Sequence, residues 1–213
     1  MTLHDLVAAA ASGSSTEEDL RAFILAASKN PAEVRQILDA SPWSAASIMR
    51  LHALRIPSPF GLALAMALIH TRSEAVLDSI ADPGTFEELL LADETANKVF
   101  STIDRMGQLA RFRPCVREHV NRAFQCMVED LPNYWKGTVD VSSHAKFLAR
   151  SLSSLPPVLL QEGLESVEEA ANRSYQQGGL RVWAKTEARW MRDYTLKELR
   201  SFATSPEKPP AVR

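Results

Sequence analysis

Apolar residues recur along this chain with the spacing of helices. They return every three or four residues in most segments, and no segment alternates apolar and polar residues as strands do. The pattern predicts an all-α protein of about ten helices. Because the predicted connections are short, we expect an irregular array of antiparallel helical hairpins, either bundle-like or solenoid-like.

Proline marks several of the predicted helix starts. It suits the first helical position because it lacks the N–H that would go unbonded there. Four capping residues are followed by proline: Asn30-Pro31, Ser41-Pro42, Ser58-Pro59 and Asp82-Pro83. The chain is predicted to form helices at 3–11, 16–28, 31–39, 43–55, 59–71, 73–81, 85–106, 113–130, 143–153, 156–175 and 179–203.

The segment 59–71 is apolar on every side of its helix. It carries Phe60, Leu62, Leu64, Met66, Leu68 and Ile69. Such a helix must be enclosed by others, so we expect it at the centre of the N-terminal core. A membrane-spanning helix needs about 20 apolar residues, roughly twice the length of this run, so no membrane span is expected.

A loop is predicted at residues 131–143, where Pro132, Asn133 and Gly137 occur close together. This loop would separate an N-terminal helical subdomain at residues 1–130 from a C-terminal one at residues 144–203. Residues 204–213 contain three prolines and are expected to form a flexible tail.

Charge is distributed unevenly along the 213 residues. The chain has a net charge of -2 and a pI near 6.2. Residues 1–100 carry 7 basic and 13 acidic side chains, whereas residues 101–213 carry 17 and 13. Only the second half is therefore expected to attract nucleic acid.

The N-terminal segment lacks a basic region and becomes acidic at Glu17, Glu18 and Asp19. This pattern does not fit a secretory signal or a transit peptide. The two cysteines are too few for the framework of a secreted, disulfide-rich domain. We therefore expect a cytoplasmic or nuclear protein with free thiols, and not a secreted one.

Candidate chemistry is sparse. Cys115 and His119 have the spacing of residues on one helix face, but Cys126 lies about 10 Å further along the axis and cannot join them on one metal ion. No nucleophile elbow, phosphate-binding loop or dinucleotide turn occurs. The sequence therefore predicts a protein that is not an enzyme and that has no catalytic residue, metal or cofactor.

The last predicted helix combines aromatic and basic residues. On a helical projection one side carries Leu180, Trp183, Ala184, Trp190, Met191, Tyr194 and Phe202, and the opposite side carries Arg181, Lys185, Arg189, Arg192 and Arg200. Each aromatic ring can bury at least about 150 Å², so the aromatic side is expected to dock the helix onto the protein body or onto a partner.

The basic side has three possible roles: a solvated exterior, a contact for an acidic protein, or a contact for nucleic acid. A second cluster at Arg105, Arg111, Arg113, Arg117 and Arg122 would enlarge the patch if the fold joined the two. The acidic pI and the lack of a nucleic-acid-binding motif favour a protein partner.

We therefore predict a helical interaction module, which is an adaptor or a structural subunit of a larger assembly. Its expected contact residues are Arg181, Lys185, Arg189, Arg192, Arg200, Arg111, Arg113 and Arg117. The partner would be an acidic protein surface or a second copy, which offers Glu162, Glu165, Glu168 and Glu169. The alternative is an RNA- or DNA-binding protein that uses the Arg105–Arg122 and Arg181–Arg200 clusters.

Overall fold

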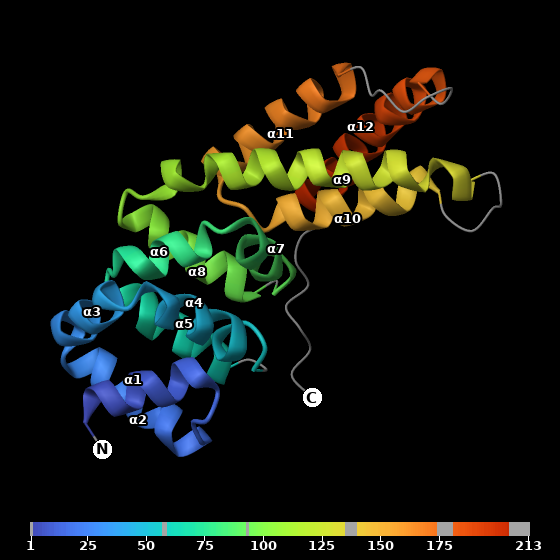
Figure 1. Cartoon of the computed structure of the whole chain (residues 1–213). Coiled ribbons are helices and arrows are strands. Elements are labelled where there is room, and N and C mark those ends of the chain that lie inside the picture. The colour runs from blue at the N-terminus through green and yellow to red at the C-terminus, as the bar shows by residue number, and fades with distance from the viewer. Residues whose placement is uncertain (1, 57–58, 93, 135–139, 174–180, 205–213) are drawn as a thin grey trace, which may run out of the picture. The chain divides into compact units, whose positions relative to one another are not determined.

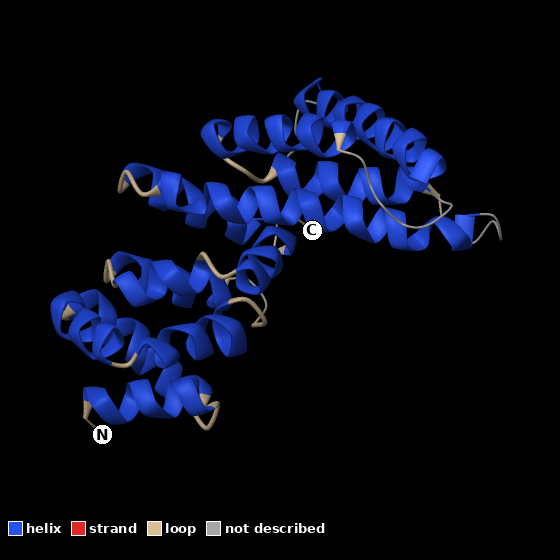
Figure 2. Cartoon of the chain, turned by 45° about the horizontal axis from the view of Figure 1, so that its top comes forward, coloured by secondary structure: helices blue, strands red, loops and turns tan. Residues whose placement is uncertain are grey.

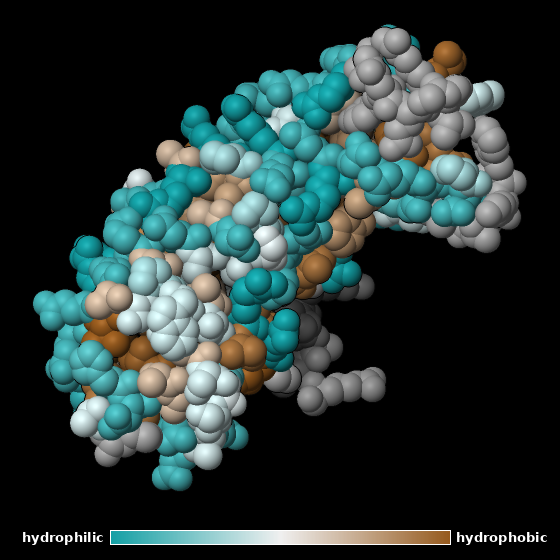
Figure 3. Space-filling view, viewed as in Figure 1, coloured by the Kyte–Doolittle hydropathy of each residue, from teal (hydrophilic) through white to brown (hydrophobic). Residues whose placement is uncertain are grey.

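A computed structural model describes residues 2–56, 59–92, 94–134, 140–173 and 181–204 of the chain. It is 86% helical, and the described residues form twelve α-helices and no strand (Figure 2). The predicted all-α helical array is confirmed. Hydrophilic side chains cover most of the surface seen in Figure 3, as expected for helices that bury one apolar face each.

The chain divides into two compact units, Met1–Cys115 (unit 1) and Val116–Arg213 (unit 2). The helices of residues 1–112 are α1 Leu3–Ser12, α2 Glu17–Lys29, α3 Pro31–Ala40, α4 Pro42–Ile48 with a π-helical turn at Met49–Ala53, α5 Phe60–His70, α6 Glu74–Ile80, α7 Pro83–Leu91, α8 Glu94–Arg105 and a 3-10 turn at Leu109–Phe112. They are followed by α9 Arg113–Tyr134, α10 Val141–Ser153, α11 Pro157–Asn172 and α12 Arg181–Thr204 (Figure 1).

Two predicted elements differ from the structure. The single helix expected at 85–106 is two helices, α7 and α8, because the amide of Ala92 bonds to the carbonyl of Leu89 and the amide of Thr95 bonds to the carbonyl of Ala92. These three-residue turns interrupt the four-residue helical pattern. The predicted loop at 131–143 begins too early, since α9 continues to Tyr134 with Pro132 inside it and Leu131 buried in the core.

The two units divide at a different place from the predicted subdomains. From Val116 onward, side chains of α9 contact the helices of unit 2: His119 Nε2 lies 2.8 Å from Ser151 Oγ of α10, and Arg173 at the end of α11 donates to Asn121 Oδ1 at 3.0 Å. Figure 1 shows α9 and α10 side by side. Within the predicted connecting loop, residues 135–139 lie outside the described residues, as do residues 205–213 of the predicted tail.

Helix α5 forms the centre of unit 1. Leu64, Leu68 and Ile69 are fully buried where α5 packs against α2, α6, α8 and the π-helical turn, which confirms their predicted place in the core. Ala63 faces solvent, so the helix is not enclosed on every side. Its start approaches the preceding turn so closely that a Cβ at Gly61 would lie 2.2 Å from the carbonyl oxygen of Ile56, which leaves room only for glycine.

Three phenylalanines join the later helices of unit 1. Phe86 of α7, Phe100 of α8 and Phe112 of the 3-10 turn are all fully buried. Their ring centroids lie 5.7 to 6.4 Å apart, and Phe100 meets both of the other rings edge to face. This geometry adds a directional aromatic contribution to the apolar area that the rings bury.

Asp39, at the end of α3, holds the start of α6. Its Oδ1 accepts hydrogen bonds from the hydroxyl of buried Ser73 at 2.6 Å and from the amide of Ala75 at 3.2 Å. Ser73 Oγ in turn accepts the amide of Val76 and caps α6. Burial raises the pKa of the Asp39 carboxyl, but the hydrogen bonds from Ser73 and Ala75 outweigh it and hold the pKa below its ordinary value.

We expect Asp39→Ala to lower the free energy of unfolding by about 1 to 2 kcal/mol at neutral pH, because it leaves the Ser73 hydroxyl buried without its acceptor. The lowered pKa means that the carboxylate stabilises the fold above its unfolded pKa of about 4, and that this stability is lost as the pH falls toward the folded-state pKa. Urea unfolding at pH 7 and pH 3 should therefore show a smaller difference from wild type at pH 3. Asp104→Ala, at an exposed position of α8, is the control. A difference that does not change with pH would contradict the role of the charge.

Candidate functional site

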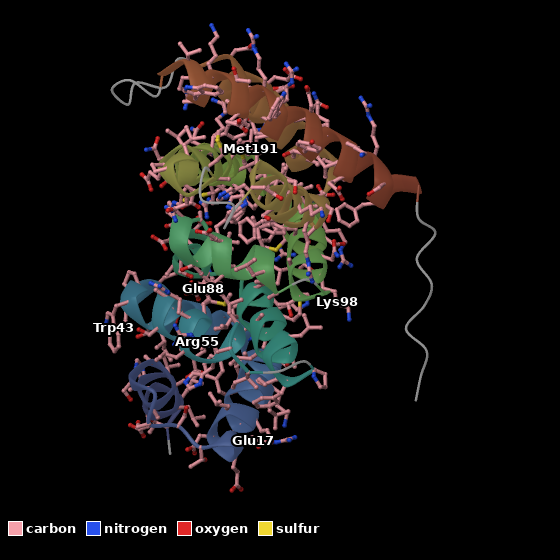
Figure 4. The ribbon with its side chains drawn as sticks, turned by 90° about the vertical axis from the view of Figure 1, so that its right-hand side faces the viewer. Glu17, Trp43, Arg55, Glu88, Lys98 and Met191 are labelled. Atoms are coloured by element: carbon pink, nitrogen blue, oxygen red, sulfur yellow. The ribbon has the colours of Figure 1, made fainter. Side chains whose placement is uncertain are left out.

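Helix α12 buries a stripe of mostly small residues. Ala184, Ala188, Met191 and Thr195 follow one another at the spacing of a helix face, and all four are fully buried. This stripe packs against α10 and α11, and Figure 4 shows Met191 at the inner side of α12. The two alanines allow the helices to approach closely, so small residues and one methionine attach α12 to the rest of unit 2.

The side of α12 that was expected to dock onto the protein body or onto a partner packs on the body through Ala184 and Met191, whereas its aromatic residues remain about half exposed. Trp183 is 55% exposed, Trp190 52%, Tyr194 41% and Phe202 46%. Trp183, Trp190 and Tyr194 project about 100° around the helix from the buried stripe. We call these three residues the aromatic edge. Leu180, which was assigned to the same side, lies outside the described residues.

Glu187 lies on the aromatic edge, one turn from both tryptophans. Its side chain is partly buried, and burial raises the pKa of its carboxyl above the ordinary value. The Glu187 carboxyl therefore lies in a less polar environment than a fully exposed carboxyl does. Val182, which is 75% exposed, adds another apolar side chain to the solvent-facing part of α12.

The basic side of α12 contains both paired and exposed cations. Arg192 donates to Asp193 at 2.8 Å and lies 3.5 Å from Glu168 of α11. The hydrogen bond that Arg192 donates to Asp193 and the nearby negative charges raise the pKa of Arg192. Lys185 and Arg189 are exposed and form no ion pair with a described residue.

Arg200 is exposed near the end of the helix, and the side chain of Arg181 lies outside the described part. Of the five basic residues predicted on α12, Lys185, Arg189 and Arg200 are therefore the exposed contacts that the structure offers.

The second predicted basic cluster is divided between the two units and largely engaged within them. In unit 1, Arg111 pairs with Glu74 at 2.5 Å and with Asp78 at 3.6 Å. In unit 2, Arg117 pairs with Glu162, and this hydrogen bond raises the pKa of Arg117. Each of these arginines holds two helices of its own unit together.

The remaining members of this cluster lie on the surface. Arg122 pairs with Glu118 one turn away at 3.2 Å, and Arg113 is exposed at the start of α9. Arg105 is exposed at the end of α8 and donates to the carbonyl of Ser101. Glu162, which was expected on an acidic contact face, is buried beneath Arg117 and cannot serve there.

The thiols and histidine of the rejected metal site have other partners. Cys115 Sγ donates to the carbonyl of Ala81 at 2.8 Å, and His119 contacts Ser151 and the ring of Phe147. Cys126 is exposed. In the part of the chain that the structure describes, no three metal-ligating side chains come together, and no helix has the length and apolar character to cross a membrane.

No protein-family model, curated protein or solved structure matches this chain.

Proposed function

We propose that this protein is a non-enzymatic interaction module, an adaptor or structural subunit, that binds an acidic protein partner through the outer face of α12. This outer face comprises the aromatic edge together with Lys185, Arg189 and Arg200. The observation that carries the proposal is that Trp183, Trp190 and Tyr194 are all more than 40% exposed on a helix that is already attached by a different stripe.

Three half-exposed aromatic rings on a single helix edge are a source of binding free energy. Burial of apolar area contributes about 25 cal/mol per Å², and a half-exposed ring still has roughly half of its area of about 150 to 250 Å² left to bury. Tryptophan, tyrosine and arginine are also the residues most enriched at the energetic centres of protein interfaces. A groove that received the outer face of α12 would contact residues at the helical spacing that groove-binding proteins recognise.

The exposed cations favour an acidic surface as the target. Lys185 and Arg189 are not neutralised by a described carboxylate, so a negatively charged partner would gain favourable interactions without displacing an internal ion pair. Nucleic acid would also be attracted to these cations, but the chain carries a net charge of -2. Its non-specific electrostatic attraction to phosphates is therefore weak.

Affinity purification with four versions of the full chain tests the proposal. The wild type should recover a partner that is lost with Trp183→Ser/Trp190→Ser and with Lys185→Glu/Arg189→Glu. Lys146→Glu, which reverses an exposed charge on α10, is the matched control and should retain it. The recovered protein is then purified and titrated directly against the same variants, and loss of the two tryptophans should weaken binding at least about tenfold.

Nuclease treatment and oligonucleotide binding distinguish a protein partner from nucleic acid, and the outer-face variants distinguish either from a solvated surface. Recovery that disappears after nuclease treatment, together with oligonucleotide binding that falls steeply with salt, would favour the nucleic-acid function instead. Equal recovery by the wild type and both outer-face variants would show that α12 presents only a solvated exterior.

A further inference from the structure

A small pocket in unit 1 is lined by three arginines from separate elements. Its volume is about 290 Å³. Arg35 comes from α3, Arg72 from the turn between α5 and α6, and Arg105 from the end of α8. Glu74 and Gln108 add polar side chains to the wall. The pocket is separate in sequence from α12 and has no part in the proposed protein contact.

The carboxylates near this pocket are already engaged. Glu74 pairs at 2.5 Å with Arg111, an arginine that does not line the pocket and that also pairs with Asp78 at 3.6 Å. Asp39, which pairs with Arg35 at 3.3 Å, accepts two further hydrogen bonds at the start of α6. Both carboxylates thus already have hydrogen-bonding partners within unit 1.

The other two arginines keep their positive charge. Arg105 donates only to neutral acceptors among the described residues, which are the carbonyl of Ser101 and the hydroxyl of Thr102. Arg72 is exposed and makes no side-chain hydrogen bond or ion pair to a described residue. The residues that line the pocket, three arginines and one glutamate, therefore carry a net charge of +2.

The backbone of Arg72 has an unusual, left-handed conformation. Arg72 has a φ of 56°, and it is the only non-glycine residue among those described with a positive φ. It directly follows the C-cap of α5, Thr71, at the position where helices most often have glycine. An arginine in this left-handed conformation is strained relative to glycine, and such strain is typical of residues whose side chain is used.

We infer that this pocket binds the phosphoryl group of a phosphate monoester. The planar guanidinium fork matches two oxygens of a phosphate, and several forks can share one group. A phosphate monoester carries a charge of about -1.5 to -2 at neutral pH, which suits the surplus of two cations better than the single charge of a carboxylate does. The small volume suits a phosphoryl group and not a large ligand.

Calorimetric titration of the full-length protein with inorganic phosphate tests this site. Saturable binding is expected, and Arg72→Gly and Arg105→Ala should each weaken it about tenfold, the effect of losing a charge-assisted hydrogen bond. Arg55→Ala removes an exposed arginine of unit 1 that does not line the pocket and should bind as wild type does. Acetate should bind much more weakly than phosphate.

Arg72→Gly also separates a binding role from a structural one. Because glycine adopts a positive φ without strain, this variant should melt at the same or a higher temperature while it loses phosphate affinity. Absence of saturable phosphate binding, equal binding of acetate, or unchanged phosphate affinity in Arg72→Gly would overturn the proposal.

Two further titrations identify the source of the phosphoryl group. A nucleoside monophosphate and a phosphoserine peptide are compared with inorganic phosphate, and the one that binds more tightly with the same dependence on Arg72 is the natural class. Peptide binding that persists after dephosphorylation would count against the site. The Trp183→Ser/Trp190→Ser variant should bind phosphate as wild type does, so failure of the α12 contact and failure of this site are distinguishable.

Discussion

Leu68→Asp is expected to unfold unit 1. Leu68 is fully buried on α5, where that helix packs against α2, α6, α8 and the π-helical turn. An aspartate there would place a charge without a partner in the core, and removal of the leucine alone costs about 2 to 5 kcal/mol. A domain of this size has a free energy of unfolding of about 5 to 15 kcal/mol, so the combined loss removes most or all of that stability.

Circular dichroism and limited proteolysis measure this loss. The variant should lose helical signal at 25 °C and should be cleaved within residues 1–115. Ala63→Asp places the same side chain on the exposed side of the same helix and should melt close to wild type. If Leu68→Asp melted at the wild-type temperature, α5 would not be the centre of the core.

Helix starts in this chain were predictable because their signals are local. Asn30-Pro31 and Ser41-Pro42 place proline at the first residue of α3 and of α4, where its missing N–H costs no helical hydrogen bond. The break after α7 was not predictable in this way. The apolar spacing of residues 85–106 continues across Ala92, and only the turn hydrogen bonds there separate the two helices.

The candidate site was partly predictable. The sequence placed the basic residues of α12 opposite Trp183 and Met191, and Lys185 and Arg189 are exposed as expected. The predicted docking side included Ala184 and Met191 of the buried stripe, but its aromatic residues were expected to form the contact because they have more apolar area to bury. Close helix packing has the opposite preference, since small side chains let two helices approach. The spacing of Ala184, Ala188 and Met191 was the available signal.

The arginine pocket had almost no sequence signal. Arg35, Arg72 and Arg105 are distant along the chain, and residues 1–100 are acidic overall. Only the fold brings α3, the turn after α5 and the end of α8 around one pocket. The left-handed backbone of Arg72 likewise depends on where α5 ends. Sites of this kind are found from tertiary geometry.

Met191→Asp is expected to detach α12 from α10 and α11, whereas Trp190→Asp is expected to leave α12 attached to them. The two residues are neighbours, but Met191 is fully buried against the unit and Trp190 is 52% exposed. A buried, unpartnered carboxylate in place of Met191 should lower the free energy of unfolding by about 3 kcal/mol or more. Trp190→Asp should change it by less than about 1 kcal/mol, because half of the ring is already in water.

Urea unfolding followed by circular dichroism compares the two variants on the same scale. If Met191→Asp is the less stable, the buried stripe attaches α12 and the aromatic edge is available to a partner. Trp190→Asp should then lose the partner while it keeps the fold. The reverse order of stability would mean that the tryptophans attach α12 to unit 2, as their hydrophobicity alone suggests, and would remove the surface on which the proposed function depends.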